Sequence, residues 1–161
     1  MAVNINGTPL KTLIVNGSKM KQLNVNGVKF WSAEETYNWS LNVQQGTSKQ
    51  WGTKTMTVQN RCIIKNIVIT PGKSYGRVQN IFVICQAGYA DINHVVKNFY
   101  NKDNNYNVNG WWTEPNTVTI NETYTISPGQ IIFFQVGASY NPNISGSHTS
   151  TGSVSFTLED I

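Results

Sequence analysis

Charged side chains are scarce in this sequence of 161 residues, where they make up only 12%, against roughly a quarter in an ordinary globular protein. Polarity comes instead from Asn, Ser, Thr and Gln, which suit turns and solvated strand faces better than exposed helices. No apolar run reaches the length that a transmembrane helix needs, and no long segment has a helical period. The sequence therefore predicts an all-β protein with no transmembrane helix and no membrane partner.

Cysteine and histidine are also rare. Cys62 and Cys85 each lie in an apolar run and form no Cys-x-x-Cys spacing, so we expect two buried thiols, with a cross-strand disulfide as the alternative. His94 and His148 are the only histidines. Asp91 lies three residues before His94, but two ligands do not make a metal site. We expect a local hydrogen bond for His94, and no metal or other cofactor.

Patterns of catalytic residues are missing as well. The eight acidic residues are scattered along the chain, and no G-x-S-x-G, phosphate-binding loop or dinucleotide fingerprint occurs. The sequence therefore predicts a protein that is not an enzyme and has no catalytic residues. The competing hypothesis, a small hydrolase or metal enzyme, would require bound metal or an activity that depends on His94.

The N-terminal segment, residues 1–31, contains a ten-residue repeat, with Asn-Gly at 6–7, 16–17 and 26–27. Asn-Gly supplies the two positive-φ positions of a type I′ hairpin turn, so residues 1–31 are predicted to form an up-and-down β-hairpin meander of about four strands. A bulge in each segment would reconcile the phases of Leu10 and Leu13. The alternative is a short solenoid with a ten-residue rung. Either sheet is too thin to be stable without a packing partner.

The whole net charge of +4 belongs to this repeat, because Lys11, Lys19, Lys21 and Lys29 face no acid before residue 32 and the rest of the chain is neutral. A basic appendage can dock on an acidic surface or contact nucleic acid. Four lysines without interleaved arginine form a poor nucleic-acid footprint, so no nucleic-acid partner is expected. The alternative is that the lysines only protect short edge strands from aggregation.

Behind the repeat, residues 32–40 are predicted to be a linker with one helical turn, since Ser32 and Glu35 fit a capping box. Residues 41–161 alternate short apolar runs with Gly, Pro and Asn, which predicts a β-sandwich domain of jelly-roll type. The expected strands are 41–44, 54–58, 62–70, 78–86, 95–99, 117–120, 124–126, 131–138 and 153–158. IFVIC and IIFFQV, apolar on both faces, should be central strands covered by a partner subunit.

The stretch 98–116 combines aromatic rings with many amides. Flat rings beside Asn and Asp side chains suit a saccharide, whose C–H groups lie on the ring while amides bond its hydroxyls. The candidate contact residues are Tyr100, Tyr106, Trp111 and Trp112. The same aromatics could instead form a protein interface or pack within the chain, and these interpretations stay open.

The opening INGTPLKTLIVNGSKMKQLNVNGVKFW resembles the N-terminal segment of many small structural proteins of tailed bacteriophages, which repeat V-N-G-x-x-V-K-x-L-x-V-N-G and end in an aromatic residue. The segments RCIIKNIVIT, GRVQNIFVICQAG and YTISPGQIIFFQV also look like the compact β-sandwiches of such proteins. The resemblance covers mainly the N-terminal repeat. It implies a virion component, either a head fibre or capsid decoration or a tail or baseplate accessory, and it carries no catalytic residues.

We therefore expect a non-enzymatic virion structural protein, assembled in the host cytoplasm, whose repeat attaches it to other virion proteins of the capsid or of the tail and baseplate. The predicted attachment residues are Leu10, Lys11, Leu13, Met20, Lys21, Leu23, Phe30 and Trp31. We also expect a homo-oligomer, with a trimer as the predicted state. The alternative function is a carbohydrate-binding adhesin that contacts host surface glycans through the 98–116 stretch.

Overall fold

Strands are the only regular secondary structure in the part of the chain that the computed structural model describes. The described residues are 4–5, 8–9, 13–15, 18–20, 22–25, 28–46, 48–72, 76–105, 116–140 and 149–161. The protein is therefore all-β, as the sequence predicts.

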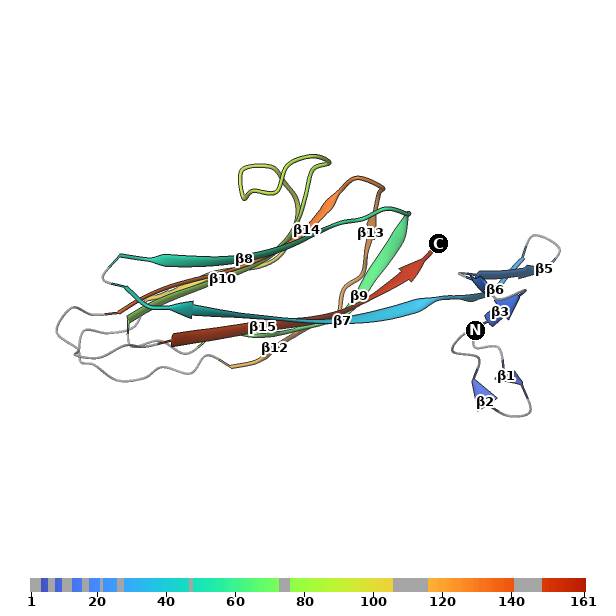
Figure 1. Ribbon diagram of the computed structural model, residues 1–161, viewed down its shortest axis with the longest axis horizontal. Helices are drawn as coiled ribbons and strands as arrows, with labels where there is room; N and C mark the ends of the chain where they lie inside the picture. Colours follow the sequence, from blue (N-terminus) through green and yellow to red (C-terminus); the bar gives the residue numbers. More distant parts are fainter. Residues whose placement is uncertain are drawn as a thin grey trace.

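Two antiparallel sheets make up the body of the molecule (Figure 1). One sheet has the order β11(Val95–Asn105), β10(Gly76–Cys85), β14(Ile131–Tyr140), β8(Gln50–Thr57). The other has the order β12(Val118–Ile120), β9(Cys62–Thr70), β15(Thr149–Asp160), β7(Glu34–Gln44), and β13(Tyr124–Ile126) also pairs with β9. The limits of β9 and β13 are those predicted, and β10 and β14 are the central strands expected from their apolar sequences. The strand predicted over 95–99 continues to Asn105.

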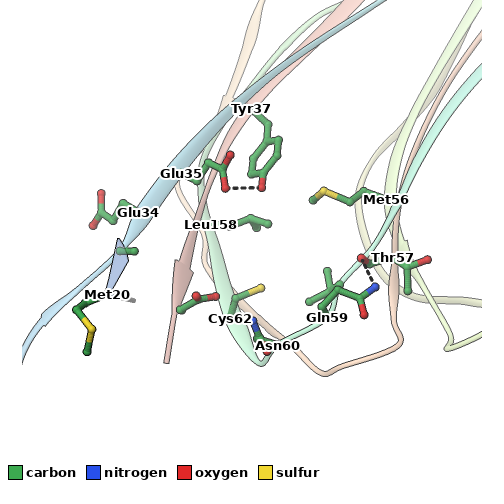
Figure 2. Close-up of a pocket in the computed structure, with 13 residues that line it drawn as sticks. Met20, Glu34, Glu35, Tyr37, Met56, Thr57, Gln59, Asn60, Cys62 and Leu158 are labelled. Atoms are coloured by element: carbon green, nitrogen blue, oxygen red, sulfur yellow. Dashed lines mark hydrogen bonds between the residues drawn. The ribbon is translucent and has the colours of Figure 1, made fainter. Parts of the chain in front are cut away.

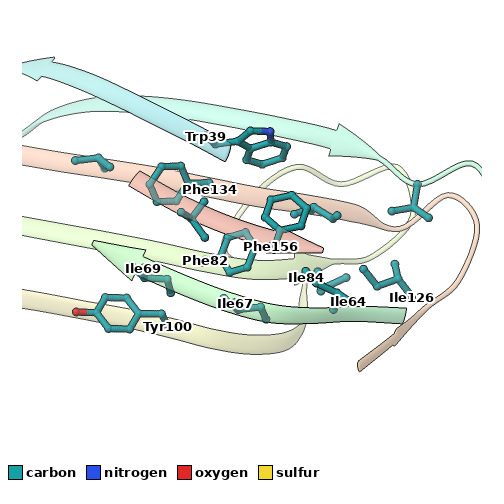
Figure 3. Packing of buried hydrophobic residues seen from close by; sticks show 14 of the residues in the cluster. Trp39, Ile64, Ile67, Ile69, Phe82, Ile84, Tyr100, Ile126, Phe134 and Phe156 are labelled. Carbon is teal, nitrogen blue, oxygen red and sulfur yellow. The ribbon is translucent and has the colours of Figure 1, made fainter. Parts of the chain in front are cut away.

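The core lies between the two sheets and is rich in Phe and Ile (Figure 3). Phe82 of β10 packs against Phe156 of β15 with ring centroids 5.4 Å apart, so the contact joins one sheet to the other. Phe134 of β14 also contacts Phe82. Buried residues alternate along β15 from Ser150 to Phe156 and along β9 on either side of Asn66, where a positive φ shifts the phase, as expected of strands with one face on a core.

A second apolar cluster lies on the outer face of the β8–β14–β10–β11 sheet. It consists of Ile81, Val83, Cys85, Ile131 and Phe133, none of which is more than 8% exposed. The chain itself therefore covers these residues. From their sequences, β10 and β14 are expected to be covered on the outside by a partner subunit. Because a single chain already buries both faces of these strands, their burial gives no evidence for such a subunit.

The described strands of the N-terminal repeat pair in three two-stranded ladders, and among these described strands no pairing links one ladder to the next. They are β1(Asn4–Ile5) with β2(Thr8–Pro9), β3(Leu13–Val15) with β4(Ser18–Met20), and β5(Gln22–Val25) with β6(Val28–Ser32). In each ladder the innermost paired residues lie on either side of an Asn-Gly dipeptide in the sequence, and the dipeptides themselves lie outside the described residues. The β5–β6 register shifts between Leu23 and Asn24. The hairpins gather at the end of the molecule where β7 begins (Figure 1).

The helical turn predicted within 32–40 is wrong, and most of that range is not a linker. Glu34–Gln44 form one continuous strand, paired with β15 from Glu34 to Gln44. Inward-facing Tyr37, Trp39, Leu41 and Val43 follow a period of two. This period begins well before residue 41, and burial of these side chains outweighs the weak capping signal.

Candidate functional site

A row of four residues crosses the outer face of one sheet near its end. Trp51 of β8 lies opposite Gly137 of β14, Gly137 opposite Gln79 of β10, and Gln79 opposite Asp103 of β11. A Cβ atom on Gly137 would lie within 3 Å of three carbons of the indole ring. The ring therefore covers the Gly137 backbone, and yet Trp51 remains 46% exposed.

Charged and amide groups surround this ring. The Lys49 ammonium lies over it, 5.1 Å from the centroid, and donates to Gln79 Oε1 at 3.0 Å and to Asp103 Oδ2 at 2.9 Å. Arg77 also donates to Asp103, from Nε at 2.8 Å and from Nη2. Gln79 Nε2 donates in turn to Asn101 Oδ1 at 3.1 Å. We call Lys49, Trp51, Arg77, Gln79, Asn101, Asp103 and Gly137 the Trp51 face.

The electrostatics of the Trp51 face centre on Asp103. Burial alone raises the pKa of its carboxyl, but the hydrogen bonds from Arg77 and Lys49 outweigh burial and hold the pKa below its ordinary value. Asp103 is therefore ionised near neutral pH. The formal charges of Lys49, Arg77 and Asp103 add up to +1.

A cavity of about 360 Å³ lies at the opposite end of the body, where Met20 of the repeat and residues of both sheets line it (Figure 2). Met56, Val58, Cys62 and Leu158 supply apolar walls, and acidic Glu34, Glu35 and Asp160 also line it. The cavity thus combines apolar surface with negative charge, beside the segment that carries the excess of lysine.

Ionisable groups in this cavity are perturbed by their surroundings. Burial, followed by the 2.8 Å hydrogen bond that Tyr37 donates to Glu35, raises the pKa of Tyr37 to about 12. Burial, followed by the charge of Asp160, raises the pKa of the Cys62 thiol to about 11. Beside the cavity, Lys65 donates to Glu34 at 2.6 Å and to Glu159 at 2.9 Å. Tyr37 and Cys62 are therefore neutral at physiological pH and act as packing and hydrogen-bonding groups.

Five of the eight predicted attachment residues lie in described hairpin strands. Leu13 pairs with Met20, and Leu23 pairs with Trp31, next to Phe30 in β6. Met20 is 36% exposed and lines the cavity. Leu10, Lys11 and Lys21 lie outside the described residues.

The predicted glycan contacts are divided in a similar way. Tyr100 is 6% exposed and belongs to the core between the sheets (Figure 3), so its ring is not presented to a ligand. Lys102 lies over that ring at 5.8 Å. Tyr106, Trp111 and Trp112 lie outside the described residues. Of the four predicted contact residues, the structure therefore describes Tyr100 alone, and its ring is buried in the core.

His94 makes the local contact expected from the sequence. Its Nδ1 lies 2.9 Å from both carboxylate oxygens of Asp91, and its ring stacks on Tyr89 with centroids 4.0 Å apart. Within the described ranges, no three His, Cys, Asp or Glu side chains come together as a metal-binding group. Cys62 and Cys85 are free and buried, the first of the two states considered from the sequence.

Sequence reasoning missed the Trp51 face. Trp51 stands alone in the segment KQWGTKT, without the aromatic clustering that drew attention to 98–116. The sequence did indicate that Trp51 lies on one face of a strand. In a strand, Trp51, Thr53 and Thr55 point to one face, and Gly52, Lys54 and Met56 point to the other. The partners of Trp51 come from three other strands, so the sequence offered no sign of the assembled face.

Comparison with known proteins leaves the structure as the main guide to function. No family model matches this sequence, and no curated protein matches it either. Among the residues that the structure describes, no helix has the length and apolarity needed to cross a membrane.

Proposed function

We propose that this protein is a non-enzymatic structural component of a bacteriophage virion, attached to the particle by residues 1–31. One observation carries the proposal: among the described residues, no strand of the three N-terminal hairpins pairs with either large sheet. Isolated two-stranded hairpins are at best marginally stable in water. A segment that adds no strand to the body and holds the whole charge excess suits docking on another protein.

The body would then be the displayed part, and we propose that it is a β-sandwich of jelly-roll type. The strand order supports this topology. With β12 and β13 counted together, the chain crosses from one sheet to the other at each step from β7 to β15, except between β10 and β11. Two interleaved sheets of this kind are the pattern of a jelly roll.

Attachment would proceed by burial of the apolar hairpin side chains against a capsid, tail or baseplate protein, with lysines setting the register on an acidic surface. On the particle the three hairpins would complete the predicted meander. Met20 supports this mechanism, because it is a large apolar side chain that remains 36% exposed.

Deletion of residues 1–31 tests attachment directly. In infected cells, the full-length chain should co-sediment with DNA-filled heads or with tails, and the deleted chain should stay in the soluble fraction. Circular dichroism should show that the deleted chain keeps its β structure. Trp51→Ala, which changes the surface outside the repeat, is the matched control and should still attach. Incorporation of the deleted chain into particles would show that the proposed attachment is wrong.

Self-association is part of the proposal, with a trimer as the proposed state. Tyr89 and Ile92, between β10 and β11, are 49% and 48% exposed, and Val96, near the start of β11, is 39% exposed. Large apolar side chains exposed together are typical of interfaces. Sedimentation velocity should give a species with a multiple of the mass of one chain, and Ile92→Lys should shift it towards the monomer. A wild-type monomer at micromolar concentration would contradict this part.

A second candidate function, a carbohydrate-binding adhesin that contacts host surface glycans, is favoured by one observation. Trp51 is a large exposed aromatic residue within a network of amide and charged groups. This combination is the one expected for sugar recognition. The candidate contact is therefore the Trp51 face, to which the 98–116 stretch contributes Asn101 and Asp103.

A further inference from the structure

We infer that the Trp51 face is a saccharide-binding site, which takes one pyranose ring of a glycan on the exposed indole of Trp51. The inference deepens the second candidate function and rests on it. It does not depend on attachment through residues 1–31, so binding by the isolated protein can fail or succeed independently of particle assembly.

The aromatic platform is held in place before any ligand arrives. Trp51 is anchored in the β8–β14 ladder opposite Gly137, whose missing side chain lets the ring lie on the backbone. Lys49 lies over the ring, 5.1 Å from its centroid, and is itself bonded to Gln79 and Asp103. The pyranose would therefore stack on the part of the indole that Lys49 and the Gly137 backbone leave in the 46% exposed fraction of Trp51. A ring that loses little freedom on binding gives more affinity per contact than a mobile one.

Groups that can bond sugar hydroxyls lie in the same row or the next one. Asn101, opposite Ile81, is exposed, and its amide nitrogen has no hydrogen-bond acceptor among the described residues. Asp103 is held ionised by Arg77 and Lys49, and a carboxylate oxygen can accept more than one hydrogen bond. A pyranose presents apolar C–H groups on its faces and donor and acceptor hydroxyls around its rim. The face offers both kinds of partner.

The surroundings favour a sugar over a protein partner. Protein interfaces have an apolar centre depleted in charge, whereas the neighbours of Trp51 on this face are Lys49, Gln79 and Asp103. In the next row, Gln135 donates to Thr53 at 3.0 Å, so the polar character continues along the sheet. The exposed apolar side chains Tyr89 and Ile92 belong to a different loop.

Direct binding to the purified full-length protein tests the site. A glycan array of neutral and acidic pyranosides identifies the sugar, and NMR titration measures affinity with N-acetylglucosamine, methyl glucoside and glucuronic acid as the solution probes. The indole N–H signal of Trp51, assigned with Trp51→Phe, should shift on titration. Trp51→Ala should weaken binding at least about tenfold, as loss of a central aromatic contact does. Asn101→Ala should weaken it several-fold.

The matched control is Ile161→Ala, which removes a large apolar side chain of similar exposure (40%) at a position outside the Trp51 face and outside the proposed oligomer interface, and it should leave binding unchanged. The thermal midpoint of each variant establishes that it is folded, and Asn101→Ala keeps the test valid if Trp51→Ala does not fold. Three results would overturn the inference: no binding of any probe, binding unchanged in both Trp51→Ala and Asn101→Ala, or an oligomer that Trp51→Ala dissociates. The last result would mark the face as a protein interface.

Discussion

Trp51 lies directly opposite Gly137 across β8 and β14, and its indole ring covers the position where a side chain of residue 137 would project. The two residues fit each other because glycine leaves the backbone bare at this point. The close approach makes Gly137 a requirement for the orientation of Trp51, although Gly137 has no functional group of its own.

Gly137→Ala should displace the indole ring and destabilise the protein. The added methyl group would lie within 3 Å of ring carbons, and such overpacking costs about 1–3 kcal/mol. Urea unfolding measures the loss. In Trp51→Ala/Gly137→Ala the methyl group has room, so the two effects should not add. Strict additivity would show that the ring and the glycine are independent.

The ionised carboxylate of Asp103 should stabilise the folded protein near neutral pH, and this contribution should be lost in acid. Its folded-state pKa lies below the ordinary value of 3.8 because the hydrogen bonds from Arg77 and Lys49 outweigh burial. A depressed pKa gives stability that is fully present above the unfolded-state pKa and is lost as pH falls through the folded-state pKa. The free energy of unfolding, measured from pH 7 to pH 2, should therefore fall less steeply below pH 4 in Asp103→Asn than in wild type. Parallel curves would contradict the ion-pair assignment.

Both thiols should resist modification in the folded protein. Cys62 and Cys85 are 2% and 0% exposed, and burial raises the pKa of both, that of Cys62 to about 11. Since the thiolate is the reactive form, a chromogenic disulfide reagent at pH 8 should react slowly with the native protein. In guanidinium chloride it should titrate two thiols. Rapid reaction of one native thiol, identified with Cys62→Ser and Cys85→Ser, would show that one site opens.

Replacement of Asn80 by leucine should stabilise the protein. Asn80 is fully buried, and neither polar atom of its side chain has a hydrogen-bond partner among the described residues. An unsatisfied buried polar group costs about 1–3 kcal/mol, while leucine has a similar size and would extend the neighbouring core. Urea unfolding should show a higher midpoint for Asn80→Leu. Asn98→Leu, at an exposed position of β11, is the control, and a lower midpoint in Asn80→Leu alone would contradict the prediction.

Local patterns predicted those parts of the fold that depend on neighbours in sequence. The apolar runs around Phe82 and Phe134 identified the two central strands, and each Asn-Gly lies between paired hairpin strands. The first half of β7 differs from the predicted helical turn because burial along the alternation from Tyr37 onwards outweighs the capping pattern of Ser32 and Glu35. Capping contributes about 1 kcal/mol, less than the burial of Trp39 and its neighbours.

Local sequence patterns could not predict the candidate site. Tyr100 belongs to an aromatic and amide-rich stretch, yet it is buried, because the register with Phe82 turns its ring into the core. Trp51 has no aromatic neighbour in the sequence, yet it is exposed in the middle of a polar network.

The sequence by itself determined the all-β class, the hairpins of the repeat, and the confinement of the net charge to residues 1–31, because each follows from composition or from spacings of a few residues. Only the tertiary structure decided which aromatic ring faces solvent and what surrounds it. Residues 49, 51, 79, 103 and 137 meet through the registers of three separate ladders. A shift of one residue in any ladder would move its side chains to the opposite face, so the face exists only once all three registers are set.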